Sequence, residues 1–162
     1  MKEPLAERVI RRIVQAAGLY YRLVMLVAPA GAGKTAALKD VHERISVPLI
    51  NVNLELSRRM LDLTKRQRIL WVQRLMGEIM SEAAADMVLL DSIEILFDNH
   101  LQQDPLRLLQ GLSRQRLIVA TWSGKYMNGS LMYADPEHQD YRRYSSEDIA
   151  GIMIVSPRGL KE

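Results

Sequence analysis

The sequence predicts an α/β protein of three layers, in which a mostly parallel sheet carries helices on both faces. Short apolar runs typical of buried strands alternate along the chain with longer segments of helical period. The 162 residues are 48% hydrophobic and 25% charged, the composition of an ordinary globular domain. No repeat or linker divides the chain, so we expect residues 1–162 to form a single domain.

Helices and strands alternate through the first half of the chain. Apolar residues at helical spacing predict a helix over 4–17 and a second one over 34–45. Between them, the apolar run 22–27 predicts a buried strand, and a short strand is expected over 48–52. The helix of residues 34–45 would therefore cover one face of the sheet between two strands.

Capping signals mark the helices of the second half. A helical stretch breaks near Leu63 and restarts at Thr64, which has capping-box spacing with Gln67. Asp104 followed by Pro105 predicts the N-cap and first residue of a helix that runs through residue 112. Three more strands and one hairpin turn complete the predicted sheet: strands 87–91, 117–121 and 151–155, and the turn at Asn128-Gly129.

Composition excludes several classes of protein. Cysteine is absent, which rules out a disulfide framework and a cysteine nucleophile. The three histidines are dispersed without metal-binding spacing. Arginines interrupt the first apolar stretches, and no apolar run approaches the roughly 20 residues of a membrane span. We therefore expect a cytoplasmic protein with no membrane segment.

One segment between a predicted strand and a predicted helix carries the clearest chemistry. It matches the phosphate-binding loop (P-loop) pattern, with alanine at the first glycine position. Its glycines let the backbone curl so that successive N–H groups face a phosphate, and the following helix adds its positive dipole end. The loop therefore predicts a P-loop NTPase fold and an ATP site made by Ala28, Pro29, Ala30, Gly31, Ala32, Gly33, Lys34 and Thr35.

Two oxygen ligands for Mg²⁺ accompany this loop. The Thr35 hydroxyl is a hard ligand at the position where the motif places one. Asp91 follows four apolar residues, which would deliver its carboxylate to the carboxyl end of a buried strand. We expect Thr35 and Asp91 to hold the metal of Mg-ATP, Asp91 through a water molecule.

The residue that would activate water is less clear from the sequence. Many hydrolysing P-loop ATPases place a glutamate directly after the metal-binding aspartate, and here that position is Ser92. Glu94 lies two residues further on and could reach back from a turn or short helix, or it could be a surface residue. Thr121 ends its strand and would either sense the γ-phosphate or make an ordinary strand-end hydrogen bond. For Asn51 and Asn53, turn-forming roles are favoured over catalytic ones.

A basic segment stands apart from the rest of the chain. The whole protein has 22 Lys+Arg and 19 Asp+Glu, whereas residues 58–74 hold six basic residues and one acid. Three interpretations are open: contact with DNA phosphates, contact with an acidic partner, and a solvated helix face. The basic residues are Arg58, Arg59, Lys65, Arg66, Arg68 and Arg74.

Beyond the P-loop, four blocks of sequence resemble the BrxF family, small P-loop proteins of BREX (bacteriophage exclusion) defence systems. The blocks are residues 49–59, 88–98, 104–114 and 133–144, which with the P-loop span nearly the whole chain. The resemblance implies an ATP-binding protein that acts with other BREX proteins, among them a methyltransferase, an alkaline-phosphatase-like protein and larger ATPases. It assigns no role to the blocks around Asn53 and Tyr133.

The sequence leaves three functions open. The first is a Mg-ATP-binding ATPase or nucleotide switch within a BREX-type complex. The second is a small-molecule kinase, which would phosphorylate an acceptor instead of releasing phosphate. The third is a non-hydrolysing adaptor or DNA-binding module in which ATP is structural, an interpretation that Ser92 keeps open. The oligomeric state is not predicted.

Overall fold

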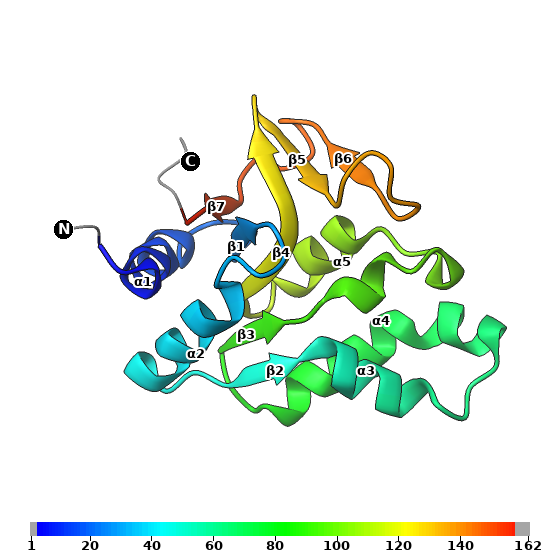
Figure 1. The fold of residues 1–162 in the computed structure, drawn as a ribbon. Helices are drawn as coiled ribbons and strands as arrows, with labels where there is room; N and C mark the ends of the chain where they lie inside the picture. Colours follow the sequence, from blue (N-terminus) through cyan, green and yellow to red (C-terminus); the bar gives the residue numbers. More distant parts are fainter. Residues whose placement is uncertain (1–2, 158–162) are drawn as a thin grey trace.

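The computed structural model describes residues 3–157 and forms a sheet in the order β2-β3-β4-β1-β7 (Figure 1). Every neighbouring pair along this path is parallel. Two further strands continue from β4 as an antiparallel meander. The strands are β1 (Leu23–Ala28), β2 (Leu49–Asn51), β3 (Met87–Asp91), β4 (Leu117–Met127), β5 (Ser130–Tyr133), β6 (Arg142–Tyr144) and β7 (Met153–Val155).

Helices cover both faces of the sheet, as predicted (Figure 1). Alternate residues of the buried strands point to opposite faces. In β1, Val24 and Leu26 join the core beneath α1 and α2, whereas Leu23 and Met25 join the larger core beneath α3 and α4. The helices are α1 (Leu5–Ala16), α2 (Lys34–Ile45), α3 (Val52–Met60), α4 (Lys65–Glu82) and α5 (Pro105–Leu112). The α/β class with a mostly parallel sheet is thereby confirmed.

The predicted caps are present at two helices. The Thr64 hydroxyl accepts from the Gln67 backbone N–H while the Gln67 side chain accepts from the Thr64 backbone N–H, a complete capping box. Asp104 accepts from the backbone N–H of Arg107, with Pro105 at the first helical position. Helix α3 follows β2 directly, so the strand expected over 48–52 is shorter at both ends.

The largest departure from prediction lies at β4. The strand expected to stop at Thr121 continues to Met127, leaves the parallel sheet and pairs with β5 through the predicted Asn128-Gly129 turn. Gly124 permits this pairing, because a Cβ built there would lie 1.8 Å from the Met132 carbonyl oxygen. Strand β6 and the 3-10 helix η2 (Asn99–Leu101) were not predicted, whereas the 3-10 helix η1 (Glu94–Phe97) is the short helix that one interpretation of Glu94 allowed.

An aromatic cluster packs the extension of β4 against η1. The Phe97 and Tyr133 rings stack with centroids 3.5 Å apart and planes 6° from parallel. Trp122 meets both rings edge-on and donates its indole N–H to the Met132 carbonyl at 3.1 Å. These contacts fix the β4–β5 hairpin relative to the segment that follows Asp91. Over residues 3–157, no helix is long and apolar enough to cross a membrane.

Candidate functional site

The P-loop connects β1 to α2 at the carboxyl end of the sheet. Gly31 and Gly33 have φ values of +79° and +93°, in the left-handed region that favours glycine. Gly33 is also the N-cap of α2, so the turn and the helix start are formed by the same residue. The first backbone N–H groups of α2 therefore open toward the loop, as an anion site requires.

Lys34 lies against this loop and is only 8% exposed. Its Nζ donates to the carbonyl oxygens of Ala28 and Pro29, both at 2.9 Å. Burial lowers the pKa of Lys34, and the nearby carboxylates of Glu94 and Asp91 oppose that shift. The lysine is thus a desolvated cation held at the loop with two acidic groups within electrostatic reach.

Strand order brings Asp91 and Thr121 together. Because β4 lies between β3 and β1, the end of β3 and the middle of β4 both lie beside the P-loop. The Thr121 hydroxyl donates to Asp91 Oδ1 at 3.0 Å, and the Ser92 backbone N–H donates to the same oxygen at 2.9 Å. Asp91 Oδ2 accepts no hydrogen bond from residues 3–157, so one carboxylate oxygen stays available to a ligand.

The turn after β3 determines where Glu94 lies. Ser92 has a φ of +55°, a left-handed conformation that a residue other than glycine adopts at a cost. The turn leads into η1, whose first residue is Glu94, and the Glu94 side chain lines the same pocket as Lys34 and Asp91. Glu94 is exposed at the pocket mouth, as one interpretation of the sequence allowed. Partial desolvation still raises the pKa of Glu94, and the charge of Asp91 adds to that effect while Lys34 opposes it.

Asn53 holds the segment that carries Glu94, a contact the sequence did not reveal. Its backbone N–H donates to the Ser92 carbonyl at 2.9 Å, and its Oδ1 accepts from the Ile95 backbone N–H at 2.8 Å. Asn51, by contrast, caps α3 by accepting from the Leu54 backbone N–H at 3.0 Å. The turn expected at both asparagines is instead the start of α3: Asn51 caps the helix, and Asn53, inside it, bonds to the residues before and after Glu94.

The predicted nucleotide residues divide between two adjoining cavities. Ala30, Gly31, Gly33, Lys34 and Thr35 line a phosphate pocket together with Asp91, Glu94 and Thr121. Pro29 instead lines a neighbouring cavity, Ala28 ends β1 as a buried strand residue, and the Ala32 N–H donates to the Pro29 carbonyl.

The donors around the phosphate pocket suit a magnesium nucleotide. The Thr35 hydroxyl and Asp91 Oδ2 are hard oxygens of the kind that Mg²⁺ prefers, and Lys34 with the start of α2 supplies positive charge for phosphates. Thr35, Asp91 and Lys34 therefore fit Mg²⁺ and a triphosphate chemically. Bound Mg²⁺ would neutralise phosphate charge and polarise the terminal phosphoryl group.

Much of the charge on the basic segment is already paired within the molecule. Arg59 forms ion pairs with Glu55 and Glu82, and Arg58 lies 3.8 Å from Glu55. Arg74 pairs with Glu78 at 3.4 Å and lies over the Trp71 ring. Within residues 3–157, the remaining basic residues of the segment have no acidic partner; they are Lys65, Arg66 and Arg68.

Comparisons with known proteins give little beyond this geometry. No protein-family description matches the chain, and no curated protein matches it. Among solved structures, the chain is similar to the structure of C. elegans PCH-2, with 18% sequence identity and a TM-score of 0.43. The similarity covers 94% of this chain and 39% of that one, so this chain spans about two fifths of its length. So distant a likeness says nothing about function.

Proposed function

We propose that this protein binds Mg-ATP in the phosphate pocket and hydrolyses it. The observation that carries the proposal is the convergence of Lys34, Asp91 and Glu94 on one pocket beside a P-loop with two left-handed glycines. A cation, a metal ligand and a second carboxylate are the groups that phosphoryl transfer to water requires.

Each group has a distinct role in this proposal. Lys34 and the backbone N–H groups at the start of α2 hold the β- and γ-phosphates, while Thr35 and Asp91 hold the metal. Thr121 keeps Asp91 oriented through the hydrogen bond between them. Glu94 orients the attacking water and accepts its proton, a role that its raised pKa suits.

Phosphate release from Mg-ATP tests the proposal directly. We expect turnover by the parent protein and none by Asp91→Asn, which keeps the shape of the side chain and loses its charge. Asp62→Asn is the matched control, because Asp62 is exposed and does not line the pocket. Phosphate appearing on an added acceptor instead of in solution would indicate a kinase, and nucleotide binding without turnover would indicate a switch or adaptor.

We further propose that the protein acts in the cytoplasm inside a BREX-type defence complex. The support is the resemblance of residues 49–59, 88–98, 104–114 and 133–144 to BrxF. Co-expression with the other proteins of such a system should yield a stable complex, and phosphate release should change when the complex forms. Failure to co-purify with any of them, with and without Mg-ATP, would contradict this role and leave ATP binding unaffected.

A further inference from the structure

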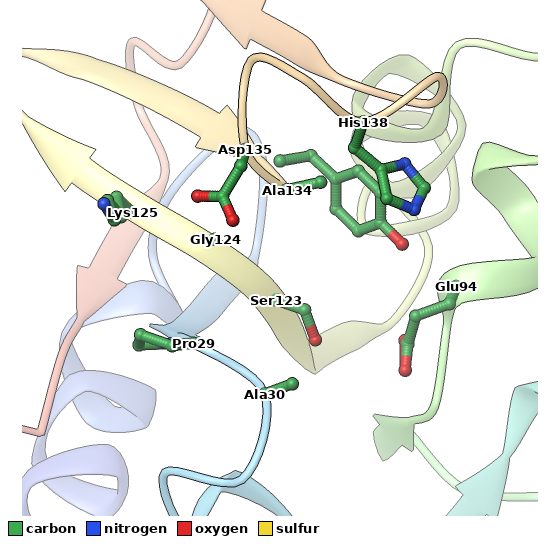
Figure 2. Close-up of a pocket in the computed structure, with 10 residues that line it drawn as sticks. Pro29, Ala30, Glu94, Ser123, Gly124, Lys125, Ala134, Asp135 and His138 are labelled. Atoms are coloured by element: carbon green, nitrogen blue, oxygen red, sulfur yellow. The ribbon is translucent and has the colours of Figure 1, made fainter.

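A second cavity of about 310 Å³ opens directly beside the phosphate pocket. Ala30, Glu94 and Ser123 line both spaces, so the two adjoin. Figure 2 shows the P-loop residues Pro29 and Ala30 on one side, the β4 extension along another, and Asp135 and His138 from the loop after β5 opposite them. The extension of β4 beyond Thr121, which was not predicted, thus helps to form a chamber beside Glu94.

Tyr133 gives this chamber a polar group that has no partner among residues 3–157. The residue lines the cavity and is only 6% exposed, and its ring is fixed by the stack on Phe97. Its hydroxyl has no hydrogen-bond partner among residues 3–157. Burial raises the pKa of Tyr133 to about 12, so the hydroxyl stays protonated at neutral pH and its oxygen can accept a hydrogen bond. The side chain is thus more than nine-tenths buried, and its unpaired hydroxyl lies at the cavity wall, where a ligand in the cavity can bond to it.

The charges around the chamber favour a positively charged ligand. Glu94 and Asp135 lie on opposite sides of the space (Figure 2). Lys125 lines the cavity from β4. Its side chain is exposed and forms no ion pair with Asp135. The His138 Nδ1 accepts from the Asp140 backbone N–H at 3.0 Å. The charges of Glu94, Asp135 and Lys125 therefore sum to a net negative charge, and a bound triphosphate would make the surroundings more negative.

We propose that this chamber binds an organic cation, a primary ammonium or a guanidinium, next to the terminal phosphate of the nucleotide. Its N–H groups donate to Asp135, the Tyr133 hydroxyl oxygen and Ser123. The nucleotide part of this inference rests on the proposed function. Because the two ligands have opposite charges and adjoin, each should increase the affinity for the other by the same factor.

Small charge-matched probes test the chamber without knowledge of the natural ligand. Ethanolamine represents a free amino alcohol and N-ethylguanidine represents an arginine side chain, while propionate is the anionic control. Titrations followed by two-dimensional NMR should give saturable shifts of the Ser123, Tyr133 and His138 signals with the cations only. Tighter binding of ethylguanidine would identify a protein side chain as the source, and tighter binding of ethanolamine a free amine. A non-hydrolysable ATP analogue with Mg²⁺ should tighten cation binding about fivefold or more.

Three variants localise the effect. Asp135→Asn should weaken cation binding roughly tenfold, as expected for loss of one charge-assisted hydrogen bond, and Tyr133→Phe should weaken it while preserving the Phe97 stack. Glu137→Gln is the matched control, because it removes a carboxylate from the same loop without lining the cavity. Equal binding of propionate, or unchanged binding by Asp135→Asn, would overturn the inference. If the protein binds the cations but does not bind ATP, that result contradicts the proposed function and leaves the cation site standing.

Discussion

Lys34 is the side chain on which nucleotide binding depends most. At an ATP concentration of 100 times the dissociation constant, binding should stabilise the fold by about 2.7 kcal/mol. Lys34→Ala should remove most of that gain, because a hydrogen bond to a charged group contributes about 1.5–3 kcal/mol. Thermal melting with and without Mg-ATP measures the difference. Lys39→Ala, an exposed lysine of the same helix, should keep the full shift; an unchanged shift in Lys34→Ala would contradict the phosphate-pocket assignment.

Glu94 should give the protein a distinctive pH dependence. Partial desolvation raises its pKa, so the carboxylate needed as a base is lost as pH falls through a value above the ordinary one of about 4.3. The acid limb of ATP turnover should therefore lie at higher pH than an ordinary glutamate would give. Glu94→Gln should lower turnover by about 10²–10⁴ with little change in ATP affinity. Turnover equal to the parent would show that Glu94 is not the base.

The same residue makes an independent prediction about stability. A folded-state pKa above the unfolded value means that ionised Glu94 costs stability at pH values above that folded pKa. Glu94→Gln should thus be at least as stable as the parent at neutral pH, and the difference should shrink as pH falls through the pKa. Urea unfolding at several pH values measures this, and a less stable variant at neutral pH would indicate a structural role.

At the scale of elements, the two asparagines at the start of α3 have different roles: Asn51 caps the helix, and Asn53 positions the η1 segment. Each accepts one backbone N–H, so Asn51→Ala and Asn53→Ala should each cost about 0.5–2 kcal/mol in the free energy of unfolding. Only Asn53 contacts the residues on both sides of Glu94. We expect Asn53→Ala to reduce ATP turnover with ATP affinity retained, and Asn51→Ala to leave turnover unchanged. Equal effects on turnover would contradict the positioning role.

The β4–β5 hairpin depends on one glycine. At Gly124 a methyl group would meet the Met132 carbonyl at 1.8 Å, so Gly124→Ala must push the strands apart and should cost about 2–4 kcal/mol. Gly111→Ala in α5 is the control, because nothing lies within 4 Å of its Cβ position and alanine favours the helix by about 0.5–1 kcal/mol. Chemical denaturation of both variants tests the pair; similar stabilities would mean that the hairpin is not tightly packed.

At the scale of the whole molecule, the distribution of charge limits how strongly duplex DNA can bind. Only Lys65, Arg66 and Arg68 of the basic segment lack an acidic partner within residues 3–157. Because each neutralised phosphate contributes about −0.9 to the log–log slope of affinity against salt, we expect a slope no steeper than about −2.7. Fluorescence anisotropy with labelled duplex at several salt concentrations measures it. A steeper slope would require the paired arginines to break their ion pairs on binding.

Local patterns of sequence determined the elements and the phosphate loop. The spacing of apolar residues predicted most helices and strands, and the caps at Thr64 and Asp104 are present because capping depends on residues three positions apart. The loop around Gly31 and Gly33 was predictable because its chemistry lies in eight consecutive residues. These features depend on near neighbours in the chain.

Only the tertiary structure decided what surrounds that loop. Strand order placed β4 between β3 and β1, which brought Thr121 onto Asp91 across 30 residues. The left-handed turn at Ser92 put Glu94 into the pocket, and Asn53 holds it from a different element. The sequence did not decide the role of Glu94. It revealed neither the hydrogen bond between Asn53 and Ile95 nor the cavity that Tyr133 lines. Such contacts join residues far apart in the chain. They are determined by how the elements pack, and the local spacing of residues carries no information about that packing.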